Sequence, residues 1–180
     1  MKKRVLCLLS PGFEEIETVT PIDLLRRAGA EVTVASVNGE SLVTGRSQIT
    51  LQADAVLADV ADQEFDLLFV PGGPGVKTLR SDGRPARLAE SFHRSGKWVA
   101  AICAGPTVLK DAHLLEGKKF TAHFSVYDEL PGALAEERVV QDGAILTSRG
   151  AGTAVDFGLA LVRALFGQEK SDEVAKAIMA

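Results

Sequence analysis

Cysteine is scarce in this chain, which has only Cys7 and Cys103 among its 180 residues. Two thiols cannot build the disulfide framework of a small secreted domain, and they lack the spacing of zinc ligands. We therefore expect no disulfide and no metal site. A reducing compartment is the usual place for such a chain, so we predict a cytoplasmic location.

Long apolar runs and basic clusters are missing as well. No apolar stretch reaches the length that spans a membrane, and the run at 5–9 is too short for the core of a signal peptide. The formal net charge is −4, the pI is about 5.4, and no basic cluster alternates with aromatic residues. These absences predict that neither a membrane nor a nucleic acid is a partner.

The order of the predicted elements indicates the fold class. A chain of 180 residues with 46% apolar and 24% charged residues is typical of one globular domain. Apolar patterns predict strands at 5–9, 31–37, 65–70, 98–102 and 120–122, hairpins at 42–53 and 139–148, and helices at 15–28, 85–94, 153–166 and 172–179. Strands that alternate with helices predict an α/β protein with a mostly parallel sheet and helices on both faces.

One predicted helix is unusually apolar. Between 153 and 166 the only charged residues are Asp156 and Arg163. A helix with so few charges is buried on more than one side. Either the helix at 172–179 covers it, or it contributes to a subunit interface.

The stretch 99–108 carries the strongest signal for function. Its apolar residues predict a buried strand that ends at Ile102, and Pro106 is typical of the first turn of a helix. Cys103 is therefore expected on a sharp strand-to-helix turn, like the nucleophile of a hydrolase elbow. Helix N–H groups favour the thiolate there, so we expect a pKa well below about 8.5. The alternative is a buried, inert cysteine.

Carboxyl and imidazole groups are the candidate partners of this thiol. Glu14, Glu15 and Glu17 stand at the start of the helix predicted at 15–28. A carboxyl group beside a thiol can act as general acid or base, but acidic residues also stabilise helix N-termini. The pattern leaves open which of the three faces the sulfur. His123, which follows a predicted strand, is the preferred histidine for proton transfer, with a structural role as the alternative.

Two glycine-rich turns lie near the predicted site. The turn at 71–75 could offer backbone N–H groups to a developing oxyanion, or could simply end a strand. The turn at 148–153 lacks the lysine of a phosphate-binding loop, so we expect no nucleotide cofactor. Functional groups collect at the carboxyl ends of parallel strands, so we expect the turns at 10–12 and 71–75 and Cys103 at one edge.

Several motifs in order make the chain similar to the ThiJ/PfpI superfamily, in particular to the branch of the parkinsonism-associated deglycase and its bacterial YajL-like relatives. They are 12–18 (GFEEIET), 23–29 (DLLRRAG), 70–73 (VPGG), 100–107 (AAICAGPT) and 146–150 (LTSRG). The resemblance covers nearly all of the chain. It implies a single flavodoxin-like three-layer sandwich over 1–180. It also implies a homodimer whose interface includes the first helix and the segments around Arg27 and Arg46.

The same resemblance assigns roles at the site. It makes Cys103 the nucleophile, Glu17 its hydrogen-bonded carboxyl partner and His123 the partner histidine, with Gly73 and Ala104 supplying oxyanion-type amides. It implies a cofactor-independent enzyme of the glyoxalase or deglycase type, which converts the small dicarbonyl methylglyoxal to lactate. The alternative is a redox-responsive stress-protection protein or chaperone, whose cysteine is oxidised to sulfinate without physiological turnover.

The chain departs from the family pattern near the predicted site. Arg46-Ser47 reverses the common Ser-Arg order, which puts an anion-binding role of Arg46 in doubt because neighbouring strand residues face opposite sides. Phe13 stands where a small residue is common and predicts a narrower pocket. PfpI-type peptidases have a histidine directly after the cysteine, where this chain has Ala104. We therefore expect no peptidase activity, and the His-x-Glu pair of glutamine amidotransferases does not occur downstream either.

Overall fold

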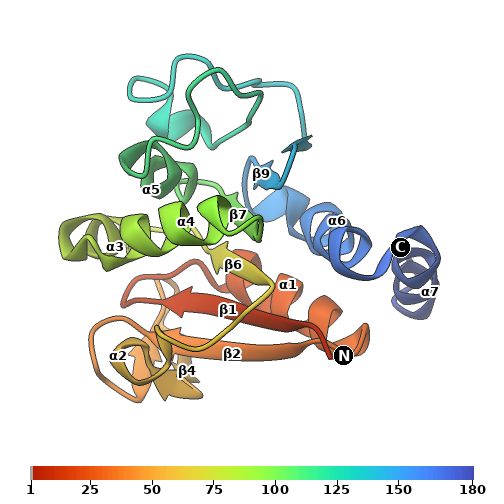
Figure 1. Ribbon diagram of the computed structural model, residues 1–180, viewed down its shortest axis with the longest axis horizontal. Coiled ribbons are helices and arrows are strands. Elements are labelled where there is room, and N and C mark those ends of the chain that lie inside the picture. Colours follow the sequence, from red (N-terminus) through yellow and green to blue (C-terminus); the bar gives the residue numbers. More distant parts are fainter. Residues whose placement is uncertain (1) are drawn as a thin grey trace.

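The computed structural model describes residues 2–180, and its elements alternate between strand and helix along most of the chain (Figure 1). The strands are β1 (Arg4–Leu9), β2 (Glu31–Ser36), β3 (Leu42–Thr44), β4 (Thr50–Gln52), β5 (Ala55–Val56), β6 (Leu67–Val70), β7 (Trp98–Ile102), β8 (Val139–Asp142) and β9 (Ile145–Ser148). The α-helices are α1 (Glu15–Arg27), α2 (Leu57–Val60), α3 (Val76–Asp82), α4 (Arg84–Arg94), α5 (Pro106–Asp111), α6 (Ala154–Phe166) and α7 (Gln168–Ala177). Two 3₁₀ turns, η1 (Phe124–Val126) and η2 (Ala151–Thr153), complete the described structure.

The main sheet has the strand order β5-β2-β1-β6-β7-β9-β8. Its strands are parallel except for β8, which pairs antiparallel with β9 through the hairpin at Asp142. β3 and β4 form a separate antiparallel hairpin. The predicted α/β class with a mostly parallel sheet is therefore confirmed.

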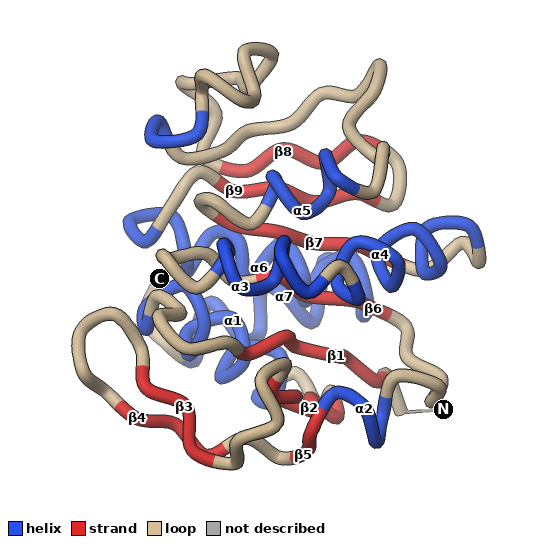
Figure 2. The backbone as a smooth tube through the Cα atoms, turned by 90° about the vertical axis from the view of Figure 1, so that its left-hand side faces the viewer, coloured by secondary structure: helices blue, strands red, loops and turns tan. Residues whose placement is uncertain are grey.

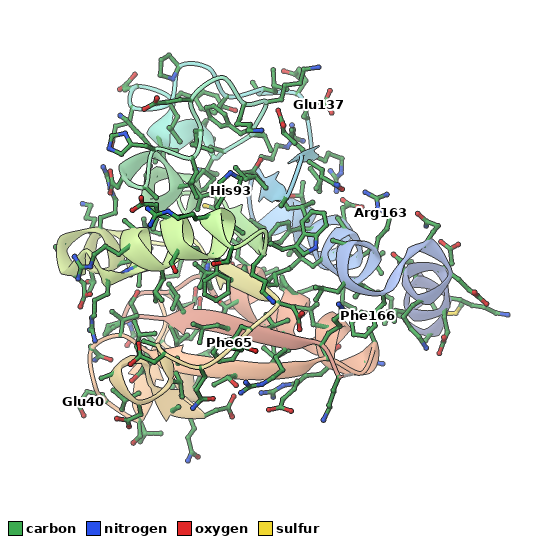
Figure 3. All side chains as sticks on the ribbon, viewed as in Figure 1. Glu40, Phe65, His93, Glu137, Arg163 and Phe166 are labelled. Atoms are coloured by element: carbon green, nitrogen blue, oxygen red, sulfur yellow. The ribbon has the colours of Figure 1, made fainter. Side chains whose placement is uncertain are left out.

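Helices cover both faces of this sheet (Figure 2). Each face has its own apolar core. Alternate residues of β1 divide between the two: Cys7 belongs to the core beneath α1 and α6, and Leu8 to the core beneath α3, α4 and α5. Side chains fill the space between the sheet and the helices on both sides (Figure 3). Because both faces are buried, the central strands are continuous apolar runs, as parallel sheets require.

The apolar helix α6 packs between α1 and α7. Phe157 is fully buried, with its ring centroid 5.7 Å from that of Phe69 in β6. On the opposite side the Ser171 hydroxyl of α7 donates a hydrogen bond to the Leu159 carbonyl, at 2.9 Å. The terminal helix therefore does cover α6, while Val155 near its start stays 40% exposed.

Two short-range expectations were wrong or incomplete. The segment 120–122 is not a strand, because the backbone N–H of Thr121 donates to the Thr147 hydroxyl at 2.9 Å instead of joining a ladder. The helices α2 and α3 were not predicted, since each is too short to show a clear apolar period. Within residues 2–180, no helix combines the length and apolar character needed to cross a membrane.

Candidate active site

Cys103 lies on a strained turn directly after β7, at the edge where the parallel strands of the main sheet have their carboxyl ends. Its φ angle is +64°, a left-handed conformation that is uncommon for a residue with a side chain. Three bonds hold the turn: Cys103 N–H donates to the Ser148 carbonyl at 2.8 Å, His123 N–H donates to the Cys103 carbonyl at 2.9 Å, and Gly105 N–H donates to the Ile102 carbonyl at 2.8 Å. The neighbouring strand and the following loop thus impose the conformation that lifts the thiol out of the sheet.

The three acidic residues of α1 have three different roles. Glu14 caps the helix, with its Oε2 accepting the Glu17 backbone N–H at 2.7 Å. Glu15 turns to the β3–β4 hairpin, where its Oε1 accepts the Ser47 N–H at 2.7 Å. Only Glu17 points to the sulfur, so the tertiary packing decides a choice that the residue pattern left open.

The Glu17 carboxyl group and the thiol meet above Gly72. A Cβ atom added to Gly72 would lie 2.2 Å from Glu17 Oε2 and 2.6 Å from Cys103 Cβ. Glu17 is only 1% exposed. Burial raises the pKa of its carboxyl group to about 7, although the hydrogen bond with Cys103 lowers it. A carboxyl group with this pKa can both give and take a proton near neutral pH.

The pKa of the thiol differs from the sequence expectation. Burial, and after it the negative charge of Glu17, raises the pKa of Cys103 to about 12. Backbone N–H groups of Gly73 and Ala104 act in the opposite direction and lower it, but they do not outweigh burial. The expectation of a low thiol pKa rested on the helix start, the backbone amides and a protonated partner; it left out burial, which outweighs them, and is therefore corrected. Since the two groups are in contact, the first proton to leave near pH 7 belongs to the pair.

His123 stands at the start of η1, next to the same cavity. Burial, and then the positive charge of Arg46, lowers the pKa of its imidazole, which favours the neutral form. Its ring stacks on Phe124 with centroids 4.0 Å apart. A neutral imidazole can donate one hydrogen bond and accept another, which suits a group that stabilises charge on a carbonyl oxygen.

A cavity of about 570 Å³ brings the predicted residues together. Its lining includes Cys103, Glu17, His123, Gly73, Ala104, Glu14, Arg46, Lys77, Arg80, Thr107, Ser125 and Glu129. Among residues 2–180, no group of three or more His, Cys, Asp or Glu side chains is arranged to hold a metal ion. The arrangement brings a thiol, a carboxyl group that titrates near neutrality, a histidine and two amides around one space.

Two sequence expectations about this space need correction. Arg46 lines the cavity. It lies in the turn between β3 and β4 and not within a strand, so the expectation that Arg46 and Ser47 face opposite sides of a strand does not apply. Phe13 is 1% exposed and packs in the core beside Gly45, so it does not narrow the cavity.

Sequence reasoning also missed residues of the outer wall. Lys77 and Arg80 belong to α3, which was not predicted as a helix, and Ser125 belongs to η1. The apolar pair Val76 and Leu79 after Gly75 was the available signal for α3. Nothing in the sequence around Ser125 marks it as part of the site.

The chain is similar in sequence and structure to several known proteins. A sequence profile described as the DJ-1/PfpI family matches residues 3–164. Protein dj-1beta of Drosophila melanogaster is 39% identical over 183 residues, which cover 99% of this chain and 98% of that protein. Its crystal structure matches with a TM-score of 0.96 at 38% identity, covering 100% and 99% of the two chains. A Caenorhabditis elegans protein named glutathione-independent glyoxalase DJR-1.2 is 35% identical, covering 97% of this chain and 95% of its own.

Proposed function

Because this chain belongs to the DJ-1/PfpI family, we propose that it is a cofactor-independent cysteine enzyme that acts on small reactive dicarbonyls and converts methylglyoxal to lactate. The buried Glu17 carboxyl group beside Cys103, in a cavity that also holds His123, carries this proposal. The name of the Caenorhabditis elegans relative supports the same reaction class.

The first step forms a covalent bond to the aldehyde carbon. The pair of Cys103 and Glu17 keeps one proton above about pH 7, so the sulfur can carry the charge while Glu17 carries the proton. The sulfur attacks the aldehyde carbon, and the carbonyl electrons move to oxygen. Glu17 gives this oxygen its proton, which yields a hemithioacetal and a carboxylate.

The second step moves hydrogen between neighbouring carbons. The Glu17 carboxylate takes the hydrogen of the former aldehyde carbon as a proton, and His123 donates a hydrogen bond to the ketone oxygen as charge develops there. Glu17 returns the proton to the second carbon, and the hydroxyl proton passes from the first oxygen to the second. The product is a thioester of lactate. Water then adds to the thioester carbonyl, the carbon–sulfur bond breaks, and lactate and the thiol are released.

The test is the turnover of methylglyoxal, followed as lactate formed by the purified protein. We expect wild-type turnover, with Cys103→Ala reduced to background and Cys7→Ala unaffected in rate. Cys7 is the matched control because it is fully buried in β1, where burial raises its pKa far above the ordinary thiol value. Wild-type turnover no higher than that of Cys103→Ala would exclude the proposal.

A second candidate function is a redox-responsive role in oxidative stress protection. Cys103 is a free thiol beside two amides that lower its pKa, and these amides can also bind the oxygens of a sulfinate. Each of two peroxide molecules transfers one oxygen atom to the sulfur and leaves as water, which converts the thiolate to sulfenate and then to sulfinate. Mass spectrometry after mild peroxide treatment tests this role. Two-oxygen addition at Cys103 without dicarbonyl turnover favours it, and random oxidation of Cys7 and methionine counts against it.

Deglycation is a more specific form of the proposed dicarbonyl reaction, and chaperone activity is a more specific form of the proposed protective role. A hemithioacetal or hemiaminal of methylglyoxal regenerates the aldehyde when its thiol or amine leaves, and Cys103 would then attack that aldehyde carbon as in the first step, so deglycase activity would use the same cavity. We also keep the proposal of a cytoplasmic location, which agrees with the presence of two free cysteines.

We further propose that the protein is a symmetric homodimer. Large apolar side chains are exposed on α1, the β3–β4 hairpin and α6, namely Ile16 (54%), Val19 (43%), Ile49 (53%) and Val155 (40%). Such neighbouring apolar groups favour contact with a second copy. Light scattering at micromolar concentration should give twice the 19.1 kDa chain mass. Ile16→Asp should shift it toward the monomer, and Met179→Asp, at a position 93% exposed near the chain end, should not. A monomeric wild type would refute the proposal.

A further inference from the structure

The imidazole of His123 is held by a residue that the proposed reaction does not use. Ser125 contacts its Nδ1 twice: the backbone N–H of Ser125 donates to Nδ1 at 3.3 Å, and the Ser125 hydroxyl oxygen lies 2.9 Å from the same nitrogen. Both contacts arise because His123 caps the 3₁₀ turn η1, which places the residue two positions later over the ring.

These two contacts determine where the imidazole proton lies. A backbone N–H can only donate, so Nδ1 must be the acceptor and cannot carry a proton. The hydroxyl group beside the same nitrogen must then also donate. In a neutral ring the remaining proton lies on Nε2. Burial and the positive charge of Arg46 keep the ring neutral by lowering its pKa.

Further contacts fix the orientation of the ring. The ring of Phe124 packs against it in a tilted arrangement, with an angle of 36° between the ring planes. Gly150 leaves room on the Nε2 side, since an added Cβ there would lie 3.3 Å from His123 Cδ2. With Nδ1 occupied by Ser125, Nε2 is the nitrogen free to meet a substrate, and Ser125 lines the same cavity as Cys103.

We propose that Ser125 is a positioning residue, which holds His123 in the tautomer that carries its proton on Nε2 and so makes it a hydrogen-bond donor toward the ketone oxygen of the substrate. The effect of this tautomer on catalysis rests on the proposed dicarbonyl reaction, whereas the tautomer itself follows from the contacts of Ser125 alone. The opposite tautomer would present a lone pair on Nε2 to the negative charge that develops on that oxygen, and would oppose the second step.

Nuclear magnetic resonance tests the tautomer directly, without substrate. Long-range proton–nitrogen correlation of ¹⁵N-labelled protein at pH 8 distinguishes a protonated from an unprotonated ring nitrogen, and His123→Asn assigns the signals. We expect Nε2–H for His123 in the wild type. Ser125→Ala should lower the ratio of Nε2–H to Nδ1–H by about fivefold, the effect of one ordinary hydrogen bond, with the backbone contact left in place. Ser125→Thr, which keeps the hydroxyl group, should restore it.

His113 supplies an internal control, because its Nδ1 lies 3.1 Å from the Glu116 carboxylate and its signals should not change in any Ser125 variant. Turnover of methylglyoxal is the second measurement: Ser125→Ala should lower kcat by no more than about fivefold, in proportion to the fraction of Nε2–H tautomer that is lost, with KM nearly unchanged, and Ser125→Thr should recover it. An Nδ1–H tautomer in the wild type, or an unchanged ratio in Ser125→Ala, would overturn the inference. The expected tautomers without any turnover would instead refute the proposed reaction and leave the positioning role of Ser125 intact.

Discussion

Replacement of Glu17 by Gln is expected to stabilise the protein at pH 8 but not at pH 4.5. Burial raises the pKa of the Glu17 carboxyl group from 4.5 to about 7. Between these pH values the folded protein keeps a proton that the unfolded chain has already released. Unfolding therefore releases a proton in this range, and a rise in pH favours the unfolded chain.

The magnitude follows from the two pKa values. They differ by about 2.5, and each unit corresponds to about 1.4 kcal/mol, so ionisation of Glu17 costs the folded state about 3 kcal/mol once the pH exceeds 7. Gln resembles the protonated carboxyl group in shape and does not ionise. The free energy of unfolding of Glu17→Gln minus that of the wild type should thus grow by about 3 kcal/mol between pH 4.5 and 8.

Urea denaturation at several pH values from 4.5 to 8 provides the measurement, with reductant present and one fixed protein concentration. Titrating groups that do not interact with Glu17 contribute equally to both proteins, so the difference between them reports on Glu17 together with its partner Cys103. Glu40→Gln, in an exposed turn after β2, controls for the loss of a carboxylate as such. A difference between Glu17→Gln and wild type that stays constant across this range would refute the reasoning, because it would mean that the folded state ionises Glu17 as readily as the unfolded chain.

Three further predictions concern the framework of the site. Gly72→Ala should abolish turnover with the fold retained by circular dichroism, since the added Cβ would lie 2.2 Å from Glu17 Oε2; normal activity would contradict the described contact. Phe157→Ala should lower the free energy of unfolding in urea by about 3–5 kcal/mol, because it empties a fully buried ring site, whereas Met179→Ala at its exposed position should change it by less than about 1 kcal/mol. Arg80→Ala removes ion pairs that join α3 to α5 and to the segment after η1, so amide exchange of that segment should accelerate severalfold; unchanged exchange would show that these pairs do not hold it.

The sequence determined much of the secondary structure by itself. The strand at 98–102 was predicted with the same bounds as β7. Its five residues are all apolar, and Gly105 and Pro106, which disfavour a strand, follow soon after Cys103. The turn at Cys103 followed from the same short-range pattern, and its positive φ confirms a sharp bend. Such features depend on residues within one or two turns of each other, and a local pattern therefore suffices to predict them.

The residue pattern did not decide which groups meet; the family resemblance pointed to Glu17, and the physical reason lies in the tertiary structure. Glu14, Glu15 and Glu17 are alike in the sequence, yet one caps a helix, one binds a hairpin and one faces the thiol. The raised pKa of the thiol pair likewise depends on burial, which is a property of the whole packed chain and not of the residues beside Cys103. Ser125 reaches the site because its turn lies against the end of β7. Local propensities determine the elements, but the burial and the neighbours of a side chain are determined by contacts between residues far apart in the sequence, and these contacts determine the chemistry.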